Sequence, residues 1–91
     1  MEEPPIPEMP IDGTLDLHTF HPSDVRPLLL DYLAACRERG IFEVRIVHGK
    51  GIGVLREIVH SELRKMEFVE SFRLAGAGSG SWGATIAVLK P

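Results

Sequence analysis

Hydrophobic and polar residues alternate near the start of the chain, and this pattern predicts its first element. In residues 14–18, Leu15 and Leu17 fall on one side and Asp16 and His18 on the other. Strict alternation is typical of a strand with one buried face. Leucine on the core side leaves the aspartate and the histidine together on the polar side.

A helical spacing of apolar residues follows. Ser23 and Asp24 are both good N-cap residues, and Pro27 is tolerated only in a first turn, which favours Asp24 as the cap. Gly40 follows three charged residues and is a natural residue just past the helix end. The apolar positions of this predicted amphipathic helix are Val25, Leu28, Leu29, Tyr32, Leu33 and Cys36.

In the second half of the chain, a strand-like pattern is again followed by a helical spacing of apolar residues. Residues 42–47 are predominantly apolar and predict a well-covered strand. A second helix is predicted next, with a polar face on which Arg56, His60 and Arg64 are spaced four apart and therefore aligned. Its apolar positions are Leu55, Ile58, Val59, Leu63 and Met66. Two further strands, 68–74 and 84–89, flank a glycine-rich loop.

These elements predict an α/β fold in the order β-α-β-α-β-β. We expect a two-layer α/β sandwich in which two helices cover a four-stranded mixed sheet. Each β-α-β unit should be a right-handed parallel crossover, and the last two strands should form an antiparallel hairpin. Residues 1–12 hold four prolines and four acids and are predicted to be a flexible acidic tail, leaving residues 13–91 as one domain.

Composition excludes several classes of protein. The chain has 91 residues, 44% of them hydrophobic and 25% charged, as in an ordinary globular domain. No apolar run is long enough to span a membrane, no signal peptide is evident, and the single cysteine, Cys36, fits a cytoplasmic setting. The net charge of −3 argues mildly against nucleic acid, but four acids lie in the tail, so the rest is about neutral.

A glycine-rich turn is the main candidate site. Gly49, Gly51 and Gly53 alternate with other residues between a predicted strand and a predicted helix, and Lys50 lies among them. Glycines permit close backbone approach, and a helix N-terminus presents N–H groups to an anion, so the turn predicts phosphate binding. Its spacing matches neither the Walker A loop nor the dinucleotide fingerprint.

Three features converge on one edge of the predicted sheet. His18 ends the first strand, His48 ends the second, and the glycine-rich loop follows the third. Ligands of parallel sheets gather at the carboxyl ends of strands. A carboxylate such as Asp16 can orient an imidazole, so Asp16, His18 and His48 are candidates for general acid–base catalysis on a phosphodiester.

No metal is required by this chemistry, and a divalent cation is the alternative. The two-histidine, one-carboxylate pattern can be drawn from Asp16, His18, His21 and His48. Arg56, His60 and Arg64 are predicted to face the nucleic acid. Trp82 either stacks on a base or folds over its own loop.

Three segments together resemble the Smr (small MutS-related) domain. They are LDLH at residues 15–18, HGKGIGVLR at 48–56 and GSWGAT at 80–85, and the similarity covers about residues 13–89. The resemblance implies a nicking or structure-directed endonuclease that depends on Asp16 and His18. It also implies that the turn from His48 to Gly51 is a signature site and that Gly80, Trp82 and Gly83 form a further motif.

The leading hypothesis is therefore a nucleic-acid endonuclease, with DNA favoured over structured RNA and a role in DNA repair or recombination. The alternatives are a non-catalytic DNA- or RNA-binding module and a binder of small phosphates. We expect no membrane partner, and a monomer or a weak dimer.

Overall fold

The computed structural model describes residues 11–17, 19–49, 53–75 and 83–91. The sequence-predicted tail, except for its last two residues, therefore lies outside the described residues. The same is true of five candidate site residues, namely His18, Lys50, Gly51, Gly80 and Trp82.

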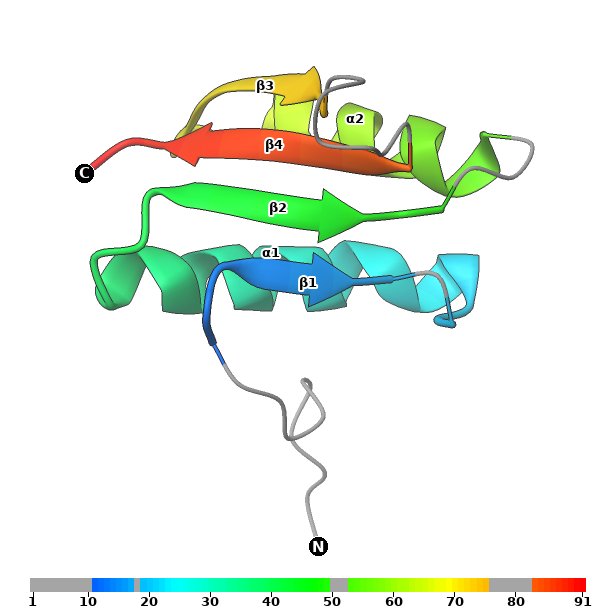
Figure 1. Ribbon diagram of the computed structural model, residues 1–91, viewed down its shortest axis with the longest axis horizontal. Helices are drawn as coiled ribbons and strands as arrows, with labels where there is room; N and C mark the ends of the chain where they lie inside the picture. The colour runs from blue at the N-terminus through cyan, green and yellow to red at the C-terminus, as the bar shows by residue number, and fades with distance from the viewer. Residues whose placement is uncertain (1–10, 18, 50–52, 76–82) are drawn as a thin grey trace, which may run out of the picture.

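Six elements follow one another in the predicted order (Figure 1). Their bounds are β1 Thr14–Asp16, α1 Pro22–Glu38, β2 Glu43–Val47, α2 Val54–Lys65, β3 Val69–Leu74 and β4 Ala84–Leu89. The strands form one four-stranded mixed sheet with the spatial order β1-β2-β4-β3. The predicted fold class is confirmed.

The sheet combines one parallel pair with two antiparallel pairs. β1 and β2 are parallel, whereas β4 is antiparallel to both β2 and β3. The predicted antiparallel pairing of the last two strands is thus confirmed. β2 and β3 run in the same direction, but β4 lies between them, so the second crossover spans a strand that the first does not.

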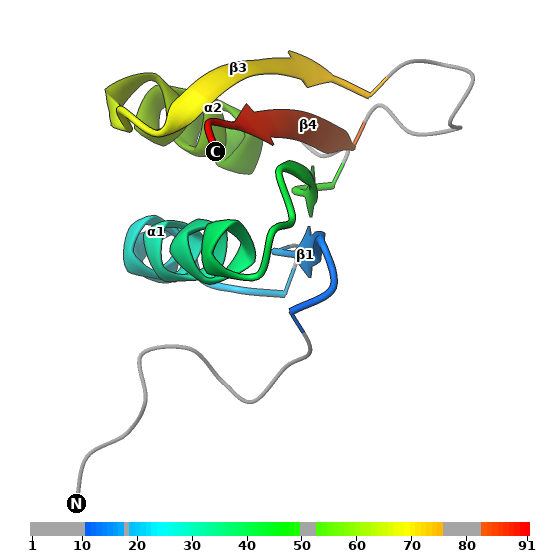
Figure 2. The same cartoon turned by 90° about the vertical axis from the view of Figure 1, so that its left-hand side faces the viewer.

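Both helices pack on one face of the sheet, as the two views agree (Figures 1 and 2). We call the other face, which neither helix covers, the open face. All six apolar positions predicted for the first helix are buried, and Cys36 is one of them, as predicted for a small core residue. They pack with apolar residues of the strands and of α2 into one core. Burial of this stripe against the sheet is the main source of helix stability.

The start of α1 differs from the prediction. The helix begins at Pro22 with His21 as N-cap, so the prediction of Asp24 as the cap is wrong. The imidazole Nδ1 of His21 accepts the backbone N–H of Ser23 at 3.2 Å, and Pro22 suits the first helical position because its φ is already fixed. Pro27 is consequently accommodated inside the helix rather than in its first two residues.

Strand ends also shift by one or two residues. β1 ends at Asp16 rather than at residue 18, β2 begins at Glu43 rather than at 42, and β3 begins at Val69 rather than at 68. Such shifts are ordinary for element boundaries. Among the described residues, no helix is long and apolar enough to cross a membrane.

Candidate functional site

The carboxyl ends of β1 and β2 meet at one edge of the sheet, and α2 begins at the same edge (Figure 1). Asp16 is the register partner of Val47, and Val47 is the partner of Ala84 at the start of β4. Leu74, which ends β3, is paired with Thr85. The ends of β1, β2 and β3 therefore converge on one edge, where the antiparallel β4 begins.

The first residues of the glycine turn are anchored to the start of β4. The backbone N–H groups of His48 and Gly49 both donate to the carbonyl oxygen of Gly83, at 2.7 and 2.9 Å. Gly49 has a φ of 86°, a conformation that glycine adopts without steric cost. Gly83, which the sequence singled out as a binding residue, is thus placed beside the turn by these two hydrogen bonds.

The far end of the turn caps α2 without a side chain. Gly53 is the N-cap residue, with a φ of 90°, and makes no side-chain capping bond. A Cβ on Gly53 would lie 2.8 Å from Nη2 of Arg56, so the guanidinium lies directly against this glycine. The first amides of a helix lack partners within it, and the helix dipole is positive there. Together with the Arg56 charge, this end of α2 favours an anion.

A chain of three polar side chains lies on the helix-covered face just behind the turn. Nε2 of His48 is 2.9 Å from Oγ1 of Thr85, and Nε2 of His60 is 2.8 Å from the same oxygen. Nδ1 of His48 is 3.1 Å from the carbonyl oxygen of Gly49. His48 is only 4% exposed and Thr85 is fully buried.

The surroundings disfavour the charged form of both imidazoles. Burial lowers the pKa of His48, and the Arg56 guanidinium lowers it further, against the opposing effect of its hydrogen bond to Gly49. Burial also lowers the pKa of His60, with further lowering from His48 and Arg64. These surroundings therefore favour the neutral form of both histidines.

Two of the predicted catalytic residues, Asp16 and His48, share an edge of the sheet but not a face. Leu15 and Leu17 are buried under the helices, so strand alternation directs Asp16 to the open face, where it is exposed. Val44 and Ile46 are buried in the same layer, and His48 continues their side of β2. Asp16 and His48 therefore lie on opposite faces of the sheet, which residue spacing within each strand could not reveal.

The predicted alignment of three side chains along α2 is corrected. Arg64 is exposed and Arg56 half-buried, but His60 points to the sheet, with its ring centroid 4.9 Å from that of Phe72 on β3. Arg64 also lies over the Phe72 ring, with its guanidinium carbon 5.7 Å from the ring centroid. Two of the three therefore remain available to the outer surface.

His21, a member of the alternative metal set, is used as a helix cap. Among the described residues, no group of three or more candidate ligands comes together. The set also includes His18, which lies outside the described part of the chain, so the metal alternative stays a prediction.

Sequence reasoning did not select Thr85 as a site residue. The available signal was its position: Thr85, Ala87 and Leu89 alternate along β4 and are all buried, which places a hydroxyl on an otherwise apolar stripe. Buried polar groups require hydrogen-bond partners, and within the described residues no buried side-chain nitrogen or oxygen lacks one.

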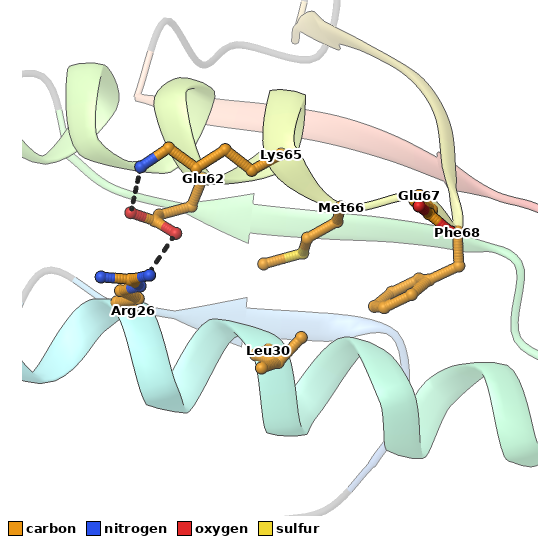
Figure 3. A pocket seen from close by; sticks show the side chains of 7 residues that line it. All are labelled: Arg26, Leu30, Glu62, Lys65, Met66, Glu67 and Phe68. Carbon is orange, nitrogen blue, oxygen red and sulfur yellow. Dashed lines mark ion pairs between the residues drawn. The ribbon is translucent and has the colours of Figure 1, made fainter.

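A groove of 310 Å³ lies on the helix side of the molecule, between α1 and the end of α2 (Figure 3). Arg26 of α1 and Lys65 of α2 both pair with Glu62, at 3.4 and 3.6 Å. The remaining lining residues are Leu30, Met66, Glu67 and Phe68. Because Arg26 and Lys65 both pair with Glu62, and Glu67 adds a second negative charge, the groove offers no excess of positive charge for an anion.

Comparison with known proteins gives a consistent assignment. A family model described as the Smr domain matches residues 15–90. The crystal structure of the Smr domain of Thermus thermophilus MutS2 superimposes with a TM-score of 0.82 at 32% identity, covering 88% of this chain and all of that one. YdaL, a stand-alone small MutS-related protein from Escherichia coli, shares the fold with a TM-score of 0.80 at 22% identity, over 87% of this chain and 65% of that one.

Relatives of known name include two proteins called endonuclease MutS2. The one from Brevibacillus brevis is 45% identical over 84% of this chain, and the one from Thermomicrobium roseum is 35% identical over 88%. In both cases the chain spans about 10% of the relative's length. The similarity therefore concerns a single domain of those proteins.

Proposed function

The chain belongs to the Smr domain family, and we therefore propose that it is an endonuclease that cleaves the phosphodiester backbone of DNA in preference to RNA. The observation that carries this proposal is the edge where the carboxyl ends of β1 and β2, the glycine turn and the start of α2 meet. The name endonuclease, carried by relatives with 45% and 35% identity, supports the same reading.

In this proposal, one phosphate of the strand binds at the glycine turn. The amide of Gly49, which the sequence predicted to bind phosphate, donates to Gly83 instead. The amides of Gly51 and Gly53, together with the first turn of α2, donate to the phosphate oxygens. The charges of Lys50 and Arg56 add to the positive end of the helix dipole. Arg64 and the loop with Gly80, Trp82 and Gly83 extend the contact along the strand.

The proposed chemistry belongs to the open face, where Asp16 lies. Asp16 orients the imidazole of His18, which takes a proton from the attacking water as the new phosphorus–oxygen bond forms. The bond from phosphorus to one sugar oxygen then breaks, and that oxygen is protonated as it leaves. His48 was predicted as a second candidate for proton transfer, but its burial favours a supporting role.

A cleavage assay tests this proposal. Purified protein is incubated with nicked, branched and supercoiled DNA and with structured RNA, with and without EDTA. Asp16→Asn and His18→Ala should each lower cleavage by about 100-fold or more, as expected for loss of acid–base catalysis. Glu43→Gln, which changes another exposed acid of the sheet at the opposite end of β2, is the matched control and should cleave normally. Full cleavage by Asp16→Asn would contradict the assignment.

The second candidate is a nucleic-acid-binding module without catalysis. One observation favours it: both ring nitrogens of His48 are engaged inside the protein, so this histidine presents no free lone pair to a substrate. This candidate predicts salt-dependent binding without strand cleavage. Arg56→Gln should weaken binding, whereas Arg39→Gln at the opposite end of the sheet should not. Turnover by the wild type would exclude it.

A further inference from the structure

The chain of side chains behind the glycine turn has a fixed hydrogen-bond direction. A backbone carbonyl only accepts, so the contact between Gly49 and Nδ1 of His48 requires a proton on Nδ1. A neutral imidazole with its proton on Nδ1 has a lone pair on Nε2. The hydroxyl of Thr85 therefore donates to Nε2 of His48.

Thr85 has a single hydroxyl proton, so its oxygen must accept from the other histidine. Nε2 of His60 accordingly carries a proton and donates to Oγ1 of Thr85. The direction runs from His60 through Thr85 and His48 to the carbonyl of Gly49. The two histidines hold complementary tautomers: the Gly49 carbonyl sets that of His48, and the Thr85 hydroxyl, by donating to His48, sets that of His60.

This direction has a consequence for the backbone of the turn. Gly49 is held on both sides: its N–H donates to the carbonyl of Gly83 at 2.9 Å, and its carbonyl accepts from His48. These two hydrogen bonds hold the peptide planes on either side of Gly49, and the residue has a φ of 86°. A glycine in this conformation would otherwise have more backbone freedom than any other residue.

We propose that Thr85 and His60 are positioning residues, which hold the ring of His48 with its proton on Nδ1 and thereby fix Gly49, the first glycine of the turn, for a phosphodiester. The part that concerns ligand binding rests on the proposed function, whereas the tautomer assignment does not. His48 is then a positioning residue as well, because its Nε2 lone pair is directed at a protein hydroxyl and its ring is almost fully covered. Both tautomers require neutral rings, which agrees with the lowered pKa of each histidine.

Nitrogen-15 NMR of the imidazole rings reads the tautomers without any ligand. The wild type should show His48 protonated on Nδ1 and His60 on Nε2. Thr85→Val keeps the shape of the side chain but removes the hydroxyl that accepts from Nε2 of His60, so His60 should lose its single tautomer, while the Gly49 carbonyl still favours Nδ1–H on His48. Thr85→Ser keeps the hydroxyl and should retain the single tautomer of His60. A wild-type His48 protonated on Nε2, or a Thr85→Val protein with unchanged tautomers, would overturn the proposal.

Binding of a fluorescent nicked DNA duplex provides the second readout. Thr85→Val should bind about 10-fold more weakly, while Thr85→Ser should stay within about twofold of the wild type. His60→Gln keeps an N–H donor and His60→Leu does not, so these two provide the same contrast if Thr85→Val fails to fold. Unchanged binding by folded variants that have lost the tautomer would overturn the positioning role. If the wild type binds no DNA, the proposed function fails while the tautomer result stands.

Discussion

The two β-α-β units of this domain use similar lengths of chain in different ways. In the first unit, α1 has 17 residues and buries six side chains, and its N-terminus is capped by an imidazole. In the second, α2 has 12 residues, buries only Val59 and Leu63, and starts at a glycine without a side-chain cap. Its inward-facing histidine joins a polar chain instead of the apolar core.

This difference separates stability from ligand binding within one small sheet. The first unit caps its own helix start with His21 and fills the core. The second unit starts α2 at Gly53 without a side-chain cap, places the Arg56 guanidinium against that glycine, and holds His48 and Gly49 before it with hydrogen bonds. We infer that substitutions in α1 change mainly stability, whereas those at the start of α2 change mainly binding.

Leu29 and Leu30 test the stabilising role of the first unit. Leu29 is fully buried in the core, whereas its neighbour Leu30 is 45% exposed at the groove of Figure 3. Leu29→Ala should lower the free energy of unfolding by about 2–5 kcal/mol, because it leaves a cavity. Leu30→Ala should cost less than about 1 kcal/mol. Urea unfolding of both variants measures the contrast, and equal losses would contradict the burial argument.

Two glycines with positive φ, one after α1 and one before α2, test the division between the units. Gly40 follows α1 with a φ of 78° and has open space where a Cβ would lie. Gly53 precedes α2 with a φ of 90° and is in contact with Arg56. Either glycine changed to alanine should cost about 1–2 kcal/mol through the positive φ alone.

Only Gly53→Ala should also displace the guanidinium and weaken DNA binding. Thermal unfolding and fluorescence anisotropy, run on Gly40→Ala and Gly53→Ala, give the two readouts. Equal binding by both variants would show that the start of α2 takes no part in recognition.

Acid should weaken the second unit through its two histidines. The pKa values of His48 and His60 are lowered in the folded protein relative to about 6.5 in the unfolded chain. The unfolded state then binds more protons as the pH falls below about 6.5, so this stabilisation is complete above that pH and is lost as the pH falls towards the folded pKa values.

The slope should reach at most about 1.4 kcal/mol per pH unit for each histidine. Arg56, Arg64 and Glu57 are the charged groups that act on the pair, and they remain in every variant. Urea unfolding between pH 7.5 and 5.5 should show a shallower slope for His60→Gln than for the wild type. Identical slopes would mean that His60 is not held neutral by its surroundings.

The sequence predicted most of the fold because binary patterning is a local signal. Helical spacing identified every buried apolar residue of α1, and alternation placed Leu15 and Leu17 on the core side. The insertion of β4 between β2 and β3 was not predicted, because alternation within a strand says nothing about its neighbours. The start of α1 was misplaced because a histidine can accept an amide N–H as serine or aspartate does.

The candidate site could be predicted in part for the same reason. The glycine turn and the shared sheet edge follow from the order of elements. The chain from His48 to Thr85 and His60 joins residues 37 and 25 positions apart, and only packing of α2 on β4 brings them together. A spacing of four residues aligns Arg56, His60 and Arg64 along α2, but it does not say which of them has a partner on the sheet.

Amide chemical-shift mapping with a nicked DNA duplex most directly tests whether nucleic acid binds at the glycine-turn edge. The amides of Gly49, Gly53 and Arg56 should shift in proportion to the DNA added, and they should shift less at higher salt. Amides that line the groove between the helices, such as those of Leu30 and Met66, should not move. Shifts confined to the groove, with the turn unaffected, would contradict the account.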